Sequence, residues 1–252
     1  LTAGSAHVMN VRGRQVVPGF IDLHIQGAGG ADVLDGSPEA LRTMSATLAR
    51  LGTTGFLATT IASPKREDAH LAVAAAHVGA DLDGATLLGL HLEGPFINPG
   101  ERRAIDPEAV YVPSGKALDR IFEITGGALS MMTVAPELDG AHEIIASLVS
   151  HGAIASFGHS SASYEETLDG FVAGITHVTH VFNAMSSIHH RNPGPLPAIV
   201  ETPQITVQLV CDGVHVHEAV VEMLYRAMGQ NRIACITDGA QEIGRASCRE
   251  RV

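Results

Sequence analysis

The sequence is poor in cysteine and has no long apolar run. Cys211, Cys235 and Cys248 are odd in number, widely spaced and without a CxxC pair, so we expect neither a disulfide framework nor a zinc knuckle, and a reducing cytoplasm fits best. The apolar runs fall well short of the roughly 18 residues that a transmembrane helix needs. The first residues lack the charged and apolar regions of a signal peptide, so we expect a soluble protein without membrane attachment.

Basic residues are also scarce. The 252 residues include 16 Lys and Arg against 27 Asp and Glu, which gives a formal net charge of −11. This balance argues against nonspecific electrostatic binding to nucleic acid or to an anionic membrane. An anionic ligand would therefore need a local positive pocket. The hydrophobic content of 45%, by contrast, is ample for a buried core.

Short apolar runs alternate with amphipathic stretches along the chain. Eight runs are too short and too rich in β-branched residues to be bundle helices: VVPGFIDLH, GTTGFLATTI, ATLLGLHLEG, LSMMTVAPE, GAIASFGHS, GITHVTHVF, QITVQLVCDG and RIACITDG. Between them lie Ala/Leu-rich stretches with helical spacing, several of which end in Gly, as helices prefer. Eight strand–helix units predict an α/β fold with a parallel sheet closed as a (β/α)8 TIM-type barrel.

The alternative is an open, doubly wound sheet. Such sheets often carry a glycine-rich phosphate loop directly after a strand. No GxGxxG, GxxxxGKS or GxxxxGKT loop follows any of the eight runs, so the nucleotide fingerprint is missing. We therefore favour the barrel.

In such a barrel the chemistry sits at the C-terminal ends of the strands. Glu93, His159 and His180, which follow the third, fifth and sixth runs, form a His₂Glu set that leaves a fourth position for water on zinc or a similar ion. Asp238, after the eighth run, is suited to take a proton from such a water and deliver it to a leaving amine. These residues predict a metal-dependent hydrolase. The other polar residues that end runs are His24, Gln26, Asn183, Asp212 and His215.

Each of these residues also has a purely structural interpretation, because a single polar residue at a strand end is a weak signal. His177 lies three residues before His180, so alternation along a strand would put the two on opposite faces. We choose His180 and expect His177 to face outward or to contact a helix. His91 shares the parity of Glu93 but should lie one layer deeper.

Several stretches together resemble the N-acetylglucosamine-6-phosphate deacetylase family of the amidohydrolase superfamily. They are PGFIDLHIQGAGGADVLDG, GTTGFLATTI, HLEGPFINP, VAPE, FGHSSAS, THVFNAM, HRNPG, DGVHVH and ITDG, and the match covers roughly residues 12 to 241. The resemblance implies metal-dependent hydrolysis of N-acetylglucosamine 6-phosphate to glucosamine 6-phosphate and acetate. It implies the same metal ligands, Glu93, His159 and His180, and the same acid/base, Asp238.

The resemblance also implies how the substrate and the metal are held. Asn183, Ala184 and Arg191 correspond to the family's phosphate site, with His215 as a further substrate contact, and the arginine implies a homodimer because it can reach across a dimer interface. Two-metal members carry His-x-His where this chain has His24 and Gln26. A neutral amide is a poor zinc ligand, so we expect one divalent ion per chain, Zn²⁺ with Fe²⁺ or Co²⁺ as alternatives. His24 would then be a weak second-site ligand, and Gln26 a partner of water or substrate.

The chain departs from the family pattern ten residues after EGP. Members often have Gly-Ala-His there, and the histidine helps to polarise the acetyl carbonyl, whereas this chain has Arg103, Ala104 and Ile105. Isoleucine cannot donate a hydrogen bond. Either Arg102 or Arg103 substitutes, or the metal acts alone, or the substrate differs. Two alternatives therefore stay open: an amidohydrolase for another N-acyl or cyclic amide substrate, and a catalytically dead barrel.

The resemblance further implies a small β-sandwich domain built from both chain ends. We expect residues 1–16 to be a remnant of that domain, residues 17–241 to form the catalytic barrel, and residues 242–252 to be a non-native tail. On this interpretation the final barrel helix and most of the sandwich are missing.

Overall fold

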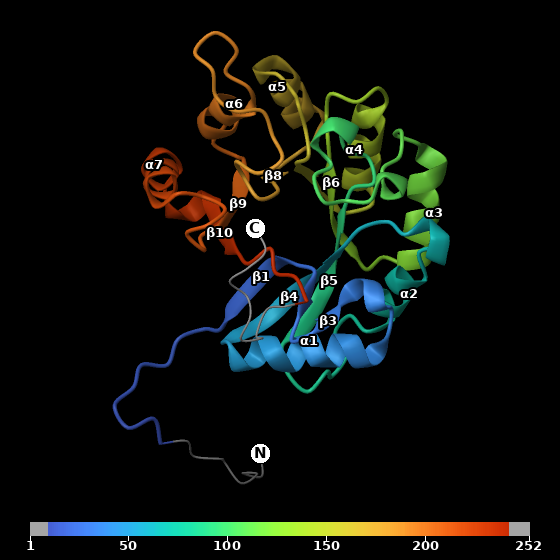
Figure 1. Ribbon diagram of the computed structural model, residues 1–252, viewed down its shortest axis with the longest axis vertical. Helices are drawn as coiled ribbons and strands as arrows, with labels where there is room; N and C mark the ends of the chain where they lie inside the picture. The colour runs from blue at the N-terminus through green and yellow to red at the C-terminus, as the bar shows by residue number, and fades with distance from the viewer. Residues whose placement is uncertain (1–9, 242–252) are drawn as a thin grey trace, which may run out of the picture.

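The computed structural model describes residues 10–241. Eight parallel strands form one sheet in chain order (Figure 1). They are β1 (Phe20–Ile25), β4 (Thr53–Thr60), β5 (Thr86–Glu93), β6 (Leu129–Val134), β7 (Ile154–Phe157), β8 (His177–Val178), β9 (Thr206–Val210) and β10 (Ile233–Ile236). A short antiparallel hairpin, β2 (Gly27–Ala28) with β3 (Ala31–Asp32), follows β1. Each of the eight apolar runs overlaps one strand of the sheet, which confirms the predicted α/β architecture.

One α-helix lies between each pair of consecutive strands of this sheet, and the helices surround it from outside (Figure 1). They are α1 (Pro38–Arg50), α2 (Ala69–Ala76), α3 (Gly115–Thr125), α4 (Ala141–Ser150), α5 (Tyr164–Ala173), α6 (Pro195–Glu201) and α7 (Glu218–Met228). Five short 3₁₀ helices lie in the connections: η1 (Val33–Asp35), η2 (Pro64–Arg66), η3 (Pro99–Glu101), η4 (Pro107–Ala109) and η5 (Gln230–Arg232). No helix among the described residues is long and apolar enough to cross a membrane.

The first and last strands meet at their C-terminal ends. Ile25 and Gly239 form a parallel bridge, the amide of Gln26 donates to the carbonyl of Gly239 over 2.8 Å, and the amide of Asp238 donates to the carbonyl of His24 over 3.0 Å. The sheet is therefore a nearly closed barrel, and the predicted alternative of an open doubly wound sheet is wrong.

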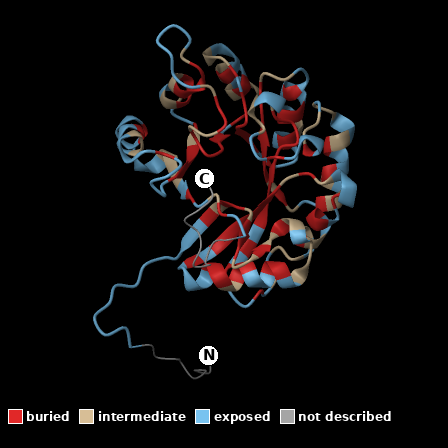
Figure 2. Ribbon diagram, viewed as in Figure 1, coloured by how far each residue is buried: buried red, intermediate tan, exposed pale blue. Residues whose placement is uncertain are grey.

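Burial follows the layers of the barrel. Most strand residues and the inner faces of the helices are buried, while the outer helix faces are exposed (Figure 2). The exceptions are the start of β1, where Phe20 and Ile21 are exposed, and β10, which is only partly buried. Large apolar side chains such as Phe56 and Phe157 are fully buried in the main core. Hydroxyl groups form a second, polar layer, in which Thr179 Oγ1 lies 2.9 Å from Thr133 Oγ1 and 2.7 Å from Ser156 Oγ. Because each of these three hydroxyls has a partner, the group avoids the desolvation cost of unpaired polar atoms.

Two histidines belong to this inner layer. His91 Nε2 lies 2.9 Å from Thr133 Oγ1, in agreement with the prediction that it lies beneath Glu93. His177 is buried, its Nδ1 lies 2.6 Å from Thr206 Oγ1, and burial together with the charge of His24 lowers its pKa to about 4. The prediction that His177 faces outward is therefore wrong, and its ring is a neutral part of the interior.

The chain ends bear on the predicted domain limits. Residues 10–19 form no helix or strand, so the described part of the predicted remnant 1–16 contributes no sheet. Residues 1–9 and the predicted tail 242–252 lie outside the described residues, as does any helix after β10. The barrel itself runs from Phe20 to Gly239, within the predicted range 17–241.

The closure of the barrel leads to a prediction about stability. A Cβ atom at Gly27 would lie 2.5 Å from the Ala31 carbonyl oxygen and 2.7 Å from the Gln241 amide nitrogen, and neither backbone atom can rotate away. We expect Gly27→Ala to lower the free energy of unfolding by about 1–3 kcal/mol, the usual range for overpacking. Chemical denaturation measures the change. Gly115→Ala is the control, because nothing lies within 4 Å of its added Cβ, and an equal loss in both variants would contradict this account of the closure.

Candidate active site

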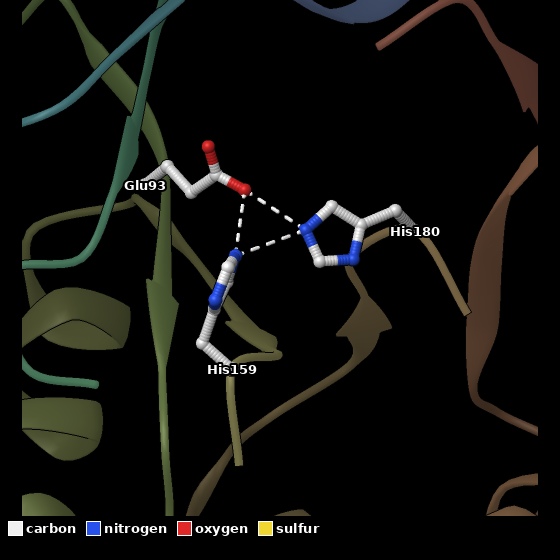
Figure 3. A group of neighbouring side chains, drawn as sticks. All are labelled: Glu93, His159 and His180. Carbon is white, nitrogen blue, oxygen red and sulfur yellow. Dashed lines mark hydrogen bonds and ion pairs between the residues drawn. The ribbon is translucent and has the colours of Figure 1, made fainter. Parts of the chain in front are cut away.

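Three predicted metal ligands converge at the carboxyl ends of their strands (Figure 3). Glu93 ends β5, and His159 and His180 each lie two residues beyond the end of β7 and β8. Glu93 Oε1 lies 2.9 Å from His159 Nε2 and 2.8 Å from His180 Nε2, and the two nitrogens are 3.1 Å apart. All three side chains are buried. Residues separated by up to 87 positions thus present one oxygen and two nitrogens to a common point.

The chemistry of these three donor atoms fits a divalent cation. Ligands around a tetrahedral zinc ion with bonds of about 2.0–2.2 Å lie roughly 3.3–3.6 Å apart, so a small outward movement of the side chains would admit the ion. His159 Nδ1 donates to the carbonyl of Glu101 over 2.8 Å. Because Nδ1 carries the proton of this bond, Nε2 of the neutral ring would offer its lone pair to a cation, the arrangement that metal-binding histidines usually have.

An unusual backbone conformation orients several of these side chains toward the site. His159, His180 and Asp238 have φ values of 49°, 26° and 50°, in the left-handed region that non-glycine residues rarely adopt. Each lies at the sharp turn that ends its strand, where an extended conformation would carry the side chain past the site. Strain of this kind costs about 1–3 kcal/mol per residue and concentrates at functional sites.

His24 lies between two carboxylates. Its Nε2 is 3.2 Å from Asp238 Oδ1 and 3.6 Å from Glu93 Oε1, while its Nδ1 lies 3.0 Å from Gln208 Oε1. Burial alone would lower the pKa of His24, but the charges of Glu93 and Asp238 hold that pKa well above its usual value. His24 is thus close to the predicted ligand set, but its ring also faces Asp238.

The two carboxylates are charged. Burial alone would raise the pKa of Glu93, but the charge of His24 and hydrogen bonds from His159 and His180 hold that pKa well below its usual range. Burial would likewise raise the pKa of Asp238, and the hydrogen bond and charge of His24 lower it. Asp238 is therefore available as a proton acceptor near neutral pH.

Gln26 contacts a predicted metal ligand. Its Nε2 donates to Glu93 Oε2 over 2.9 Å, which leaves Oε1 of Glu93 to face the two histidines. Gln26 also lines the cavity above the three ligands. Its amide therefore orients the carboxylate, a contact that the sequence did not predict.

A cavity of about 490 Å³ lies over these residues. Glu93, His159, His180 and Asp238 contribute to its wall, and apolar side chains including Ile61, Ile105 and Phe182 line much of the rest. The wall thus combines converging polar and charged groups with apolar side chains, as sites for polar small molecules do.

The predicted substrate residues divide into two groups. Asn183, Ala184 and His215 line the cavity, and His215 Nδ1 is held 2.7 Å from Asp212 Oδ2. Arg191 is exposed and lies outside the residues that line the cavity. Its amide donates to His189 Nδ1 over 3.3 Å, in the loop between β8 and α6.

Sequence reasoning missed one residue of this region and left another undecided. Gln208 is fully buried and holds His24, and a glutamine inside the apolar run QITVQLV is a signal that could have found it. Arg103 was one of two alternatives. Arg103 lines the cavity, whereas Arg102 donates to the carbonyl of Ile105 over 2.7 Å and so supports the loop.

A nearly closed parallel barrel with a buried His₂Glu set and a neighbouring aspartate is typical of metal-dependent hydrolases. The sequence profile of the Amidohydrolase family matches residues 15–251, and the chain belongs to this family. Of the strand-end residues chosen from the sequence, Glu93, His159, His180 and Asp238 lie together at the wall of one cavity.

Relatives of this chain include sugar-phosphate deacetylases. It is 38% identical to the N-acetylglucosamine-6-phosphate deacetylase of Bacillus subtilis over 91% of this chain and 59% of that protein. It is 32% identical to the N-acetylgalactosamine-6-phosphate deacetylase of Escherichia coli O157:H7, over 90% of this chain and 60% of that protein. The chain thus spans about three fifths of the length of these relatives.

Solved structures of similar proteins share the fold. The crystal structure of N-acetyl-D-glucosamine-6-phosphate deacetylase from Mycobacterium smegmatis superposes with a TM-score of 0.85 at 35% identity, covering 91% of this chain and 65% of that chain. A mutant of that enzyme in complex with N-acetyl-D-glucosamine-6-phosphate gives a TM-score of 0.82 at 34% identity, covering 90% of this chain and 58% of that chain.

Proposed function

We propose that the protein is a metal-dependent deacetylase that hydrolyses N-acetylglucosamine 6-phosphate to glucosamine 6-phosphate and acetate. The observation that carries the proposal is the convergence of Glu93, His159 and His180 beside Asp238 at the wall of one cavity. The names of the relatives support this substrate class.

We propose one divalent ion per chain, held by Glu93, His159 and His180. Zn²⁺ suits this mixed nitrogen and oxygen set best, and Fe²⁺ or Co²⁺ would also suit it. Gln26 supports a single ion, because its amide nitrogen points at Glu93 Oε2 and a donor group repels a cation. His24 would be at most a weak ligand of a second ion, since its Nε2 faces the Asp238 carboxylate.

In the proposed mechanism Asp238 carries the proton. Glu93, His159 and His180 would hold the cation, which would supply polarisation of the acetamide carbonyl and a lower pKa for a bound water. The Asp238 carboxylate accepts a proton from the attacking water and delivers it to the leaving amine nitrogen, first as base and then as acid. His24 stabilises the charged form of Asp238, and Gln208 holds the His24 ring in place through Nδ1.

Substrate binding is proposed to involve Asn183, Ala184 and His215 at the cavity wall and Gln26 near the reacting amide. Arg191 is exposed on its loop. We therefore propose that the protein is a homodimer in which Arg191 contacts the phosphate of the substrate bound in the neighbouring subunit. We also propose a cytoplasmic location, because the three cysteines are odd in number, widely spaced and without a CxxC pair, which suggests no disulfide framework.

Acetate release from two sugars tests the proposed function. We expect turnover of N-acetylglucosamine 6-phosphate and a much lower kcat/KM for unphosphorylated N-acetylglucosamine, because a charge-assisted phosphate contact contributes about 1.5–3 kcal/mol, or roughly 10- to 160-fold. Protein treated with a chelator is the control and should release little acetate. Equal rates with both sugars would contradict the assigned substrate.

A second candidate is the same reaction on a different N-acyl substrate. Ile105 favours it, because this apolar side chain lines the cavity where a donor to the acyl carbonyl is expected. N-acetylgalactosamine 6-phosphate is the first alternative to assay, given the relative with that substrate in its name. If N-acetylgalactosamine 6-phosphate were hydrolysed faster than N-acetylglucosamine 6-phosphate, the galacto sugar would become the proposed substrate. A dead barrel would release acetate from neither sugar and need not retain metal.

A further inference from the structure

The loop after β5 brings one permanently charged cation to the cavity. Among the described residues that line the cavity, Arg103 is the sole lysine or arginine. The chain as a whole carries a net charge of −11, so on average it repels a negatively charged, phosphorylated substrate. A local cation at the cavity is therefore needed to bind a dianion.

Arg103 is at the rim of the cavity, and the reacting groups are at its floor. The Arg103 side chain is 61% exposed, whereas that of Glu93 is 4% exposed. An anion bound by Arg103 would thus lie away from the amide that the floor residues attack. In an amino-sugar phosphate the amide and the phosphate are likewise at separate ends of the molecule.

The Arg103 guanidinium has donors to spare. Its Nη2 forms an ion pair with Glu101 Oε2 over 2.7 Å, and within residues 10–241 the side chain donates no hydrogen bond of good geometry to a protein oxygen. A guanidinium has five N–H donors and binds phosphate in a bidentate manner. The neighbouring Arg102 differs, because it is committed to the carbonyls of Arg103 and Ile105.

The backbone fixes Arg103 relative to the reaction centre. Its φ of 51° lies in the left-handed region, which an arginine adopts only when its surroundings enforce it. Glu101, the ion-pair partner of Arg103, also accepts a hydrogen bond at its carbonyl from His159 Nδ1. One short loop thus positions both a metal-ligand candidate and the rim cation.

We propose that Arg103 binds the phosphate of the substrate and so determines specificity for phosphorylated over unphosphorylated amino sugars. This role rests on the proposed deacetylase function. It gives each subunit a cation of its own at the cavity, in addition to Arg191. Ile105, two residues further on, contributes an apolar wall beside the reacting amide rather than a donor.

Binding measurements that do not need turnover test the role of Arg103. Titration calorimetry gives the Kd of the protein for glucosamine 6-phosphate and for glucosamine. We expect Arg103→Met to weaken binding of the phosphorylated sugar by about 10- to 100-fold, the usual effect of losing a charge-assisted contact, and to leave glucosamine binding unchanged. Lys116→Met, which removes an equal charge from the exposed surface of α3, should change neither Kd.

The outcomes separate this role from the proposed function. Equal weakening for both sugars, or no weakening for either, would overturn the assignment of Arg103. If the wild-type protein released no acetate from any N-acetyl sugar, the deacetylase proposal would fail, and the two Kd values would still decide whether Arg103 selects phosphate. If Arg103→Met does not fold, Arg103→Gly serves instead, because glycine adopts the left-handed backbone without strain.

Discussion

Replacement of Asp238 by asparagine is expected to lower kcat by about 10²- to 10⁴-fold, the usual effect of removing an acid/base group. Asparagine keeps the size and shape of the side chain but cannot accept and return a proton. Asp238 provides none of the three converging ligand atoms, so the metal content of the variant should match that of the wild type. Acetate release and metal analysis on the same sample measure both quantities.

Asp169→Asn is the control for this variant. Asp169 is exposed on α5, so the same chemical change there should leave kcat at the wild-type value. If Asp238→Asn released acetate at the wild-type rate, the role of Asp238 as the acid/base would be contradicted. A variant that loses both turnover and metal would instead make Asp238 a ligand.

Replacement of His159 by glutamine is expected to remove the metal, and activity with it. His159 provides one of two imidazole nitrogens in the set, and its Nδ1 is already held by Glu101. Losing an outer-shell partner alone typically lowers metal affinity about 10- to 100-fold, and loss of a direct ligand should exceed that. Metal titration with a competing chelator measures the affinity, and acetate release measures the activity.

His177→Gln is the matched control for the ligand variant. His177 is another buried histidine of the barrel, but it binds Thr206 and is not part of the converging set. We expect this variant to lose stability while it keeps wild-type metal content. Equal metal loss in both variants would mean that any damage to the barrel releases the ion, and the ligand assignment would lose its support.

The strand-end rule predicted the main site because parallel strands bring their carboxyl ends to one edge. Glu93, His159 and His180 could be chosen before any distance was known, since each closes an apolar run. The helices were harder to predict. α6 (Pro195–Glu201) contains two prolines and only one turn of apolar spacing, so its pattern is weak and its position follows from packing against the barrel.

The error at His177 has a specific cause. Alternation of faces applies only while a strand continues, and β8 ends at Val178. His180 then has a φ of 26° and Phe182 a φ of 78°, so the backbone turns and parity is lost between residues 177 and 180. Both histidines can therefore point inward, at different depths.

Contacts made by long polar side chains could not be predicted from spacing. Gln26 follows β1 at an interval of two from His24, which placed it near the site but did not reveal its bond to Glu93. Arg103 lies in a loop without periodicity, and its direction depends on a left-handed backbone and on Glu101. These contacts depend on tertiary packing, which local sequence patterns do not record.

The most direct test of the central claim is the metal content of the active protein. Elemental analysis combined with acetate release from N-acetylglucosamine 6-phosphate gives both quantities on one sample. We expect close to one divalent ion per chain, with activity that is lost on chelation and restored by adding that amount of metal. Two ions per chain at full activity, or full activity without metal, would contradict the account.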